Sequence, residues 1–203
     1  TPNITVDNKV YLKESIMCWI NTSSPGLASK PAIGWDVYGG QSYMGYYSRI
    51  AFAWPELTGL PENPDFVEIQ VYHWSCQSST LTNNRHVSIY DINATWEDSS
   101  IPSWDGRPAH DSGVSEKAYG CISCYTGNST LSTWIPITSL KAYYDSWFNN
   151  PSFYGFAIYS NEAWNSGDLI SIRGPGYADP SLRPILRITR GGNTVDFVFE
   201  ELP

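Results

Sequence analysis

The chain has 203 residues, a formal net charge of −8, 16% charged residues and 15% aromatic residues. This length suits one β domain that buries a core of its own. The 12 Lys and Arg residues form no cluster, which argues against a nucleic-acid surface and against acidic lipids or polymers held by charge alone. No segment reaches the roughly 18–20 apolar residues of a membrane span.

The chain begins with Thr1 rather than Met and shows no signal peptide. We therefore expect a mature, processed chain of a secreted or cell-surface protein. The abundance of Tyr, Trp, Ser, Thr, Asn and Gly is typical of a secreted β-protein with many turns.

Strand-like segments dominate the chain, and Gly, Pro and Asn clusters separate them. In chain order they read NKVYLKES, SRIAFAWPEL, DFVEIQVYHW, RHVSIYDI, YGFAIYS, DLISIRG and RPILRIT. Alternating apolar and polar residues over such short runs are typical of a sandwich. The sequence predicts an all-β fold, an antiparallel β-sandwich of the jelly-roll type, in a single domain over residues 1–203.

One helical pattern interrupts the strands, in TSLKAYYDSWFNNP. Its apolar residues recur at i, i+3, i+4, i+7 and i+8; they are Leu140, Tyr143, Tyr144, Trp147 and Phe148. The pattern predicts a short amphipathic helix near residues 139–149, which covers one end of the sandwich and is ended by Asn149-Asn150-Pro151.

Two strand-like extensions flank this domain, at residues 1–8 and 191–203. Gly191 and Gly192 follow the strand ILRITR, and a new alternating run then begins. The tail either folds back as an edge strand of its own sheet or enters the sheet of a neighbouring copy, and the front segment is a second possible donor. The residues expected to form an assembly strand are Ile4, Val6, Val195, Phe197 and Phe199.

Four cysteines and four Asn-X-Ser/Thr sequons fit an extracellular chain. An even cysteine count predicts two disulfides without fixing their connectivity, with free thiols or a metal or redox site as alternatives. The sequons predict N-glycosylation, with unoccupied sites as the alternative. The cysteines are Cys18, Cys76, Cys121 and Cys124, and the sequon residues are Asn3, Asn21, Asn93 and Asn128.

The order of several segments resembles a known family. IGWDVYGGQSYMGYYSRIAFAWPELTGLP, VEIQVYHW, RHVSIYDINATWEDSSIPSWDGRPA, WIPITSLKAYYDSWFNNPSFYGFAIYS and RPILRIT follow one another as in the DNRLRE-type extracellular modules. These are jelly-roll domains grouped with carbohydrate-binding modules. The resemblance covers about residues 9–190, so both extensions lie outside it.

The chemistry of the sequence points away from catalysis. The three histidines are scattered, and no GxSxG, HExxH or phosphate-binding glycine loop is present. The resemblance implies a module that accompanies enzymes, so we expect no enzymatic activity. No cofactor is required; a structural calcium ion, as in many jelly-roll modules, has Asp105, Asp111 and Asp168 as candidate ligands.

Two functions remain open. The first is a self-assembling filament or cell-surface subunit whose terminal strand completes the sheet of the next copy, head to tail. The alternative is a polysaccharide-binding module with an aromatic platform around a glycine-rich turn. That platform would consist of Trp35, Tyr38, Tyr43, Tyr46 and Tyr47. These aromatics could instead be buried in a loop or at a subunit contact.

Overall fold

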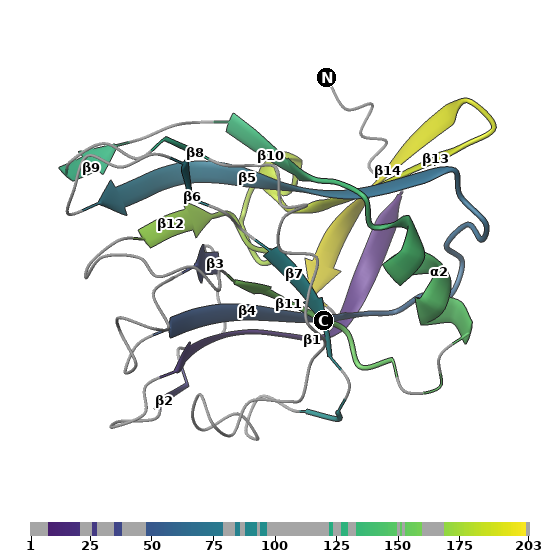
Figure 1. Ribbon diagram of the computed structural model, residues 1–203, viewed down its shortest axis with the longest axis horizontal. Helices are drawn as coiled ribbons and strands as arrows, with labels where there is room; N and C mark the ends of the chain where they lie inside the picture. The colour runs from purple at the N-terminus through teal and green to yellow at the C-terminus, as the bar shows by residue number, and fades with distance from the viewer. Residues whose placement is uncertain are drawn as a thin grey trace.

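A computed structural model of the chain describes residues 8–20, 26–27, 35–37, 48–78, 84–85, 88–92, 94–96, 122–123, 127–129, 133–149, 151, 153–159 and 169–201. These residues are mainly β-sheet with one α-helix, α2 (Lys141–Asn149) (Figure 1). The longer strands are β1 (Lys9–Ile20), β4 (Ser48–Pro55), β5 (Phe66–Ser78), β10 (Thr133–Ile137), β13 (Ile185–Arg190) and β14 (Asn193–Glu201). The shorter ones are β2 (Gly26–Leu27), β3 (Trp35–Val37), β6 (Asn84–Arg85), β7 (Ser88–Asp91), β8 (Ile122–Ser123), β9 (Gly127–Ser129), β11 (Phe156–Tyr159) and β12 (Leu169–Ile172).

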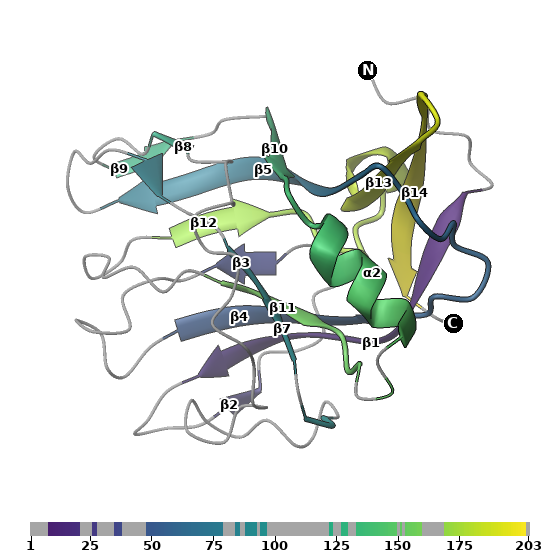
Figure 2. The ribbon, with the colours of Figure 1, turned by 45° about the vertical axis from the view of Figure 1, so that its right-hand side comes forward.

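Most strands join one mixed sheet, in the order β3-β12-β5-β13-β14-β1-β4-β11-β7. Strands β9 and β10 add to β5, and β2 adds to β1, while β6 and β8 form a separate pair. The sheet curls until β3 lies near β4, so that its shape is nearly that of a barrel (Figure 2).

The β-rich class and the short helix are therefore confirmed, while the wholly antiparallel arrangement is wrong. Strand β1 runs parallel to β14, with Lys9 opposite Val198 and Leu12 opposite Glu201. The first and last long strands of the chain thus lie side by side and run in the same direction. The jelly-roll sandwich itself stays a prediction.

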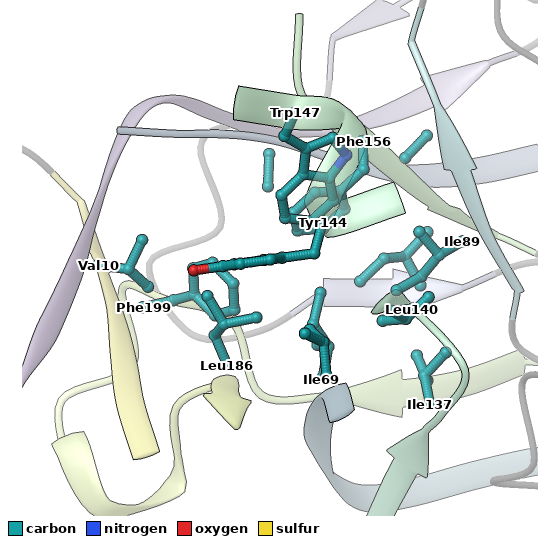
Figure 3. Close-up of a cluster of buried hydrophobic side chains, with 14 of the residues drawn as sticks. Val10, Ile69, Ile89, Ile137, Leu140, Tyr144, Trp147, Phe156, Leu186 and Phe199 are labelled. Carbon is teal, nitrogen blue, oxygen red and sulfur yellow. The ribbon is translucent and has the colours of Figure 1, made fainter. Parts of the chain in front are cut away.

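The core lies on the inner face of the curled sheet, and α2 covers part of it. Tyr144 lies at the centre of the cluster with its hydroxyl toward Val10 and Phe199 (Figure 3). That hydroxyl donates a hydrogen bond to the carbonyl oxygen of Pro61, and burial raises the pKa of Tyr144. Trp147 stacks on Phe156 with ring centroids 5.9 Å apart and donates from Nε1 to Asp91 Oδ1 at 3.0 Å.

The predicted apolar face of the helix is confirmed. Leu140, Tyr144 and Trp147 are buried, and Tyr143 and Phe148 pack against the core while partly buried. Fully burying one such side chain contributes about 1.5–3 kcal/mol. This contact explains why a nine-residue helix, too short to be stable in isolation, forms at this place.

Strands β13 and β14 form a hairpin closed by Gly191 and Gly192. Arg190 pairs with Asn193 across the two-residue loop, and both glycines have positive φ, 57° and 80°. Two left-handed residues give the turn whose twist matches that of the flanking strands, and glycine adopts this conformation without steric cost. The two glycines thus form a tight turn rather than a linker.

Candidate functional site

The tail strand β14 lies inside its own sheet, between β13 and β1 (Figures 1 and 2). Six residue pairs join it to β13 and four join it to β1. Phe199 is 1% exposed and belongs to the core, and Phe197 packs against the core while partly buried. The expectation that residues 191–203 form an extension beyond a complete domain is therefore corrected for β14: its alternation reflects a place in the core.

The two halves of β14 differ in their pairing. Residues 198–201 pair with β1. Among the described strands, residues 193–197 pair only with β13. The amide of Val198 donates to the carbonyl of Asn8 at 2.9 Å, and the amide of Phe199 donates to Pro184 on the other side at 3.0 Å. Since backbone groups alternate along a strand, the N–H and C=O groups of Thr194 and Asp196 point to the side away from β13.

A line of charges crosses the outer face of the sheet beside this half-paired segment. Arg187 of β13 donates two parallel hydrogen bonds to Asp196, at 2.7 and 3.0 Å, and Glu68 of β5 lies 3.6 Å from the same guanidinium. Asp196 is 3% exposed, and its hydrogen bond is the main cause that raises the pKa of Arg187. This bidentate geometry fixes the side chains of Arg187 and Asp196. The negative charge of Asp196 is therefore balanced by the guanidinium of Arg187.

A second charged group holds the other half of β14. Lys9 of β1 lies 2.9 Å from Glu200, and Arg183 lies 3.3 Å from its other carboxylate oxygen. The pKa of Glu200 is lowered, first by its hydrogen bond with Lys9, and the same bond raises the pKa of Lys9. The carboxylate therefore links β14 to β1 and to the segment that precedes β13.

Replacing Glu200 by Gln is expected to remove a pH-dependent part of the stability. Because the pKa of Glu200 is lower in the folded than in the unfolded chain, its contribution is present above its unfolded pKa of about 4.3 and is lost as the pH falls through the folded pKa. The wild-type protein should exceed E200Q in free energy of unfolding at neutral pH, and the difference should shrink toward about pH 3. Urea denaturation at both pH values measures this, and an equal difference at both would contradict it.

A pocket of about 310 Å³ opens on the same outer face, beside the start of β5. Phe66 forms part of its wall and is 72% exposed. Its polar lining consists of Glu68, Thr138, Ser139, Lys141, Arg187 and Thr189. Ser139 has a φ of 61°, a left-handed conformation that costs a non-glycine residue about 1–2 kcal/mol. Strain of this kind is often found at functional sites.

The charges around this pocket largely cancel. Arg187 is held by Asp196 and Glu68, and Lys141 forms an ion pair with Asp145 one helical turn away. A second pocket of about 320 Å³ lies beside β1 and β14, lined by Lys9, Asp179, Pro180, Ser181, Arg183, Val198 and Glu200. Lys9 and Arg183 both pair with Glu200, and the Asp179 carboxylate accepts hydrogen bonds from Ser181.

Few of the other residues expected to form sites are described. Trp35 lies in β3, opposite Ile172 of β12, and Asn128 lies in β9, opposite Gln77 of β5. Cys18 is in β1 and Cys76 in β5, strands that are not neighbours in the sheet. Outside the described residues lie Ile4, Val6, Tyr38, Tyr43, Tyr46, Tyr47, Cys121, Cys124, Asn3, Asn21, Asn93, Asp105, Asp111 and Asp168.

The sequence reasoning missed the pocket at Phe66 and the pair of Arg187 with Asp196. One signal for the pocket was available, because Phe66 shares its face of the strand with Glu68 and Gln70 and is thus an apolar residue on a polar face. The ion pair had no local signal, because it depends on the register between two strands.

Two kinds of feature are absent from the described part of the chain. No helix there is long and apolar enough to span a membrane. No group of three or more His, Cys, Asp or Glu residues gathers there to bind a metal ion.

No model of a protein family matches the chain, and no curated protein matches it. The resemblance to the DNRLRE-type modules therefore stays a prediction.

Proposed function

We propose that this chain is a non-catalytic, extracellular structural subunit that assembles with copies of itself by adding a terminal strand to a neighbour's sheet. The observation that carries the proposal is the half-paired edge of β14. Along residues 193–197 the strand has a partner on one side among the described strands. An edge with unpaired N–H and C=O groups is a template for a strand from another chain.

The sequence of this edge supports pairing. Natural proteins protect exposed edges with Lys, Pro or a bulge, and NTVDF contains neither Lys nor Pro. Its one charged residue, Asp196, is already neutralised by Arg187. Val195 and Phe197 offer apolar surface on the inner face, where both side chains are partly buried. An incoming strand would gain main-chain hydrogen bonds and apolar contacts together.

In this assembly, β14 accepts a strand from a neighbouring copy and does not itself act as the donor. To leave its own sheet, β14 would have to separate from both neighbours and withdraw Phe199 from the core. Accepting a strand requires neither the separation of β14 from its neighbours nor the withdrawal of Phe199 from the core. The extracellular location rests on the even cysteine count and the sequons. A contact in which one copy donates a strand and the next copy accepts it is head-to-tail, and it propagates into a fibre unless it closes a ring.

Assembly is tested on the purified full-length chain. Electron microscopy should show filaments or sheets, and sedimentation should show mass that grows with protein concentration. A monodisperse monomer over the whole accessible concentration range would rule the function out.

The pocket at Phe66 favours a second candidate function, the binding of a polysaccharide. An exposed aromatic face beside hydroxyl and charged groups is the combination that a sugar ring needs, and a pocket of about 310 Å³ is within the range of small-ligand sites. Because the nearby charges are paired with each other, a neutral sugar fits this pocket better than an acidic one.

Replacing Phe66 by Ala should abolish retardation of the protein in gels that contain a neutral polysaccharide such as xylan or mannan. Tyr11→Ala is the matched control, because Tyr11 is also an exposed aromatic residue of this sheet, at 40% exposure, and lies away from the pocket. Phe66→Trp should keep binding. Equal retardation of wild type and Phe66→Ala would exclude this site.

A further inference from the structure

The geometry points to one occupant of the half-paired edge of β14: residues 3–6 of a second copy of this chain. This inference rests on the proposed assembly and names its donor and acceptor. The acceptor consists of the N–H and C=O groups of Thr194 and Asp196, on the side away from β13. The donor is the segment NITV, which precedes β1 and alternates apolar residues at Ile4 and Val6.

The register of β1 shows where such a strand would lie. Lys9 pairs in parallel with Val198 and Val10 with Phe199, so each of residues 9–12 faces the residue 189 positions later. Val10 and Phe199 are both buried, which shows that paired residues share a face of the sheet. A strand that lies along residues 193–197 in the direction of β1 would thus place every second residue on the inner face, beside Val195 and Phe197.

The chain's own front segment fits this edge poorly in that register. A direct continuation of β1 would set Asp7 beside Asp196, on the outer face. Arg187 already serves two carboxylates there, those of Asp196 and Glu68, and Asp7 would add a third. Like charges directly opposite each other on neighbouring strands are destabilising.

A segment from a second copy is not tied to this register. A shift by two residues sets Ile4 beside Val195, Thr5 beside Asp196 and Val6 beside Phe197. Both apolar side chains then face apolar partners, and the Thr5 hydroxyl lies beside the carboxylate. The donor must leave the edge at Asp7, because Lys9 of the acceptor already occupies the place beside Val198. Asp7 is then set near the cationic Lys9.

Replacing Thr194 by Pro tests the acceptor edge in the full-length protein. Proline removes the Thr194 N–H, which points away from β13, and such positions at sheet edges tolerate proline. Thr194→Ala is the matched control, because it also loses the hydroxyl contact with Thr189 at 2.9 Å but keeps the amide. We expect T194A to polymerise like wild type. We expect T194P to need at least tenfold more protein to polymerise while its thermal unfolding stays cooperative.

Replacing Asp7 by Lys distinguishes a donor in the second copy from the chain's own segment. In the proposed register the ammonium group introduced in the donor would meet Lys9 of the acceptor, so D7K should weaken polymers. If the chain's own segment lay beside Asp196, D7K would relieve repulsion and raise the melting temperature with polymers unchanged, which would overturn the inference. Polymers of T194P at the wild-type concentration would also overturn it and leave assembly intact. A wild-type chain that stays monomeric would overturn both.

Discussion

Replacing Phe199 by Ala is expected to lower the free energy of unfolding by about 3–5 kcal/mol, the range for truncating a large buried aromatic side chain. Phe199 is 1% exposed, and its ring meets that of Phe156 at 6.1 Å and 67°. Strands β1 and β4 lie between β14 and β11 in the order of the sheet, so this contact joins two strands that are not neighbours. The truncation would leave a cavity that a rigid sheet cannot close.

Phe66→Ala is the matched control for this loss. It removes the same atoms from a side chain that is 72% exposed, so the free energy of unfolding should change by less than about 0.5 kcal/mol. Urea denaturation measures both variants, and an unchanged dependence on urea would show that the compactness of the two end states is preserved. A small loss for Phe199→Ala, comparable to that of Phe66→Ala, would contradict the place of β14 in the core.

This expectation affects how assembly can be tested. A chain that lacks residues 191–203 would lose Phe199 and the strand that joins β13 to β1. Such a truncation is expected to unfold the protein, so a loss of polymers would say nothing about which segment is the donor. Substitutions that spare the core, such as Thr194→Pro, separate assembly from folding.

The parts of the fold that depend on local pattern could be predicted from the sequence. Alternation in DFVEIQVYHW predicts a strand with Val67, Ile69 and Val71 on one face, and these three residues are buried in β5. The spacing of Tyr144 and Trp147 predicts the face that α2 buries. Both predictions need the period of the pattern and no knowledge of the partner.

The place of β14 could not be predicted in the same way. Alternation shows that Val195, Phe197 and Phe199 share a face, but a strand with one apolar face can pair with any sheet that offers a register. Its parallel partner is β1, at the other end of the chain, and no local signal marks this contact. The tight turn at Gly191 and Gly192 favours a hairpin with β13. The two glycines alone do not decide between that hairpin and a tail that enters the sheet of a neighbouring copy.

The candidate site was harder to predict, because it is built from residues of several strands. Glu68, Arg187 and Asp196 become neighbours through the registers of β5 with β13 and of β13 with β14. A sequence gives the residue types without those registers. The aromatic residues near Trp35 stand out in the sequence, yet Trp35 is the one member of the expected platform in the described part of the chain.

Among the described glycines with positive φ, Gly155 is the one where an added methyl group should cost the most. Its φ is 89°, and an added Cβ would collide with the carbonyl oxygen of Ala53 and lie 2.8 Å from Cα of Trp54. These are backbone atoms of β4, which pairs with β11 directly after Gly155. The carbonyl of Gly155 also accepts from the amide of Ile92 at 3.1 Å, so the glycine cannot shift without loss on its other side.

Gly155→Ala is therefore expected to lower the free energy of unfolding by about 3 kcal/mol or more, from backbone strain of about 1–2 kcal/mol and overpacking of about 1–3 kcal/mol. Gly59→Ala separates the two causes, because Gly59 has a similar φ of 84° but nothing lies within 4 Å of its Cβ position. It should show the strain alone, about 1–2 kcal/mol. Chemical denaturation of both variants measures the difference, and equal losses would mean that β4 and β11 separate more easily than their close approach implies.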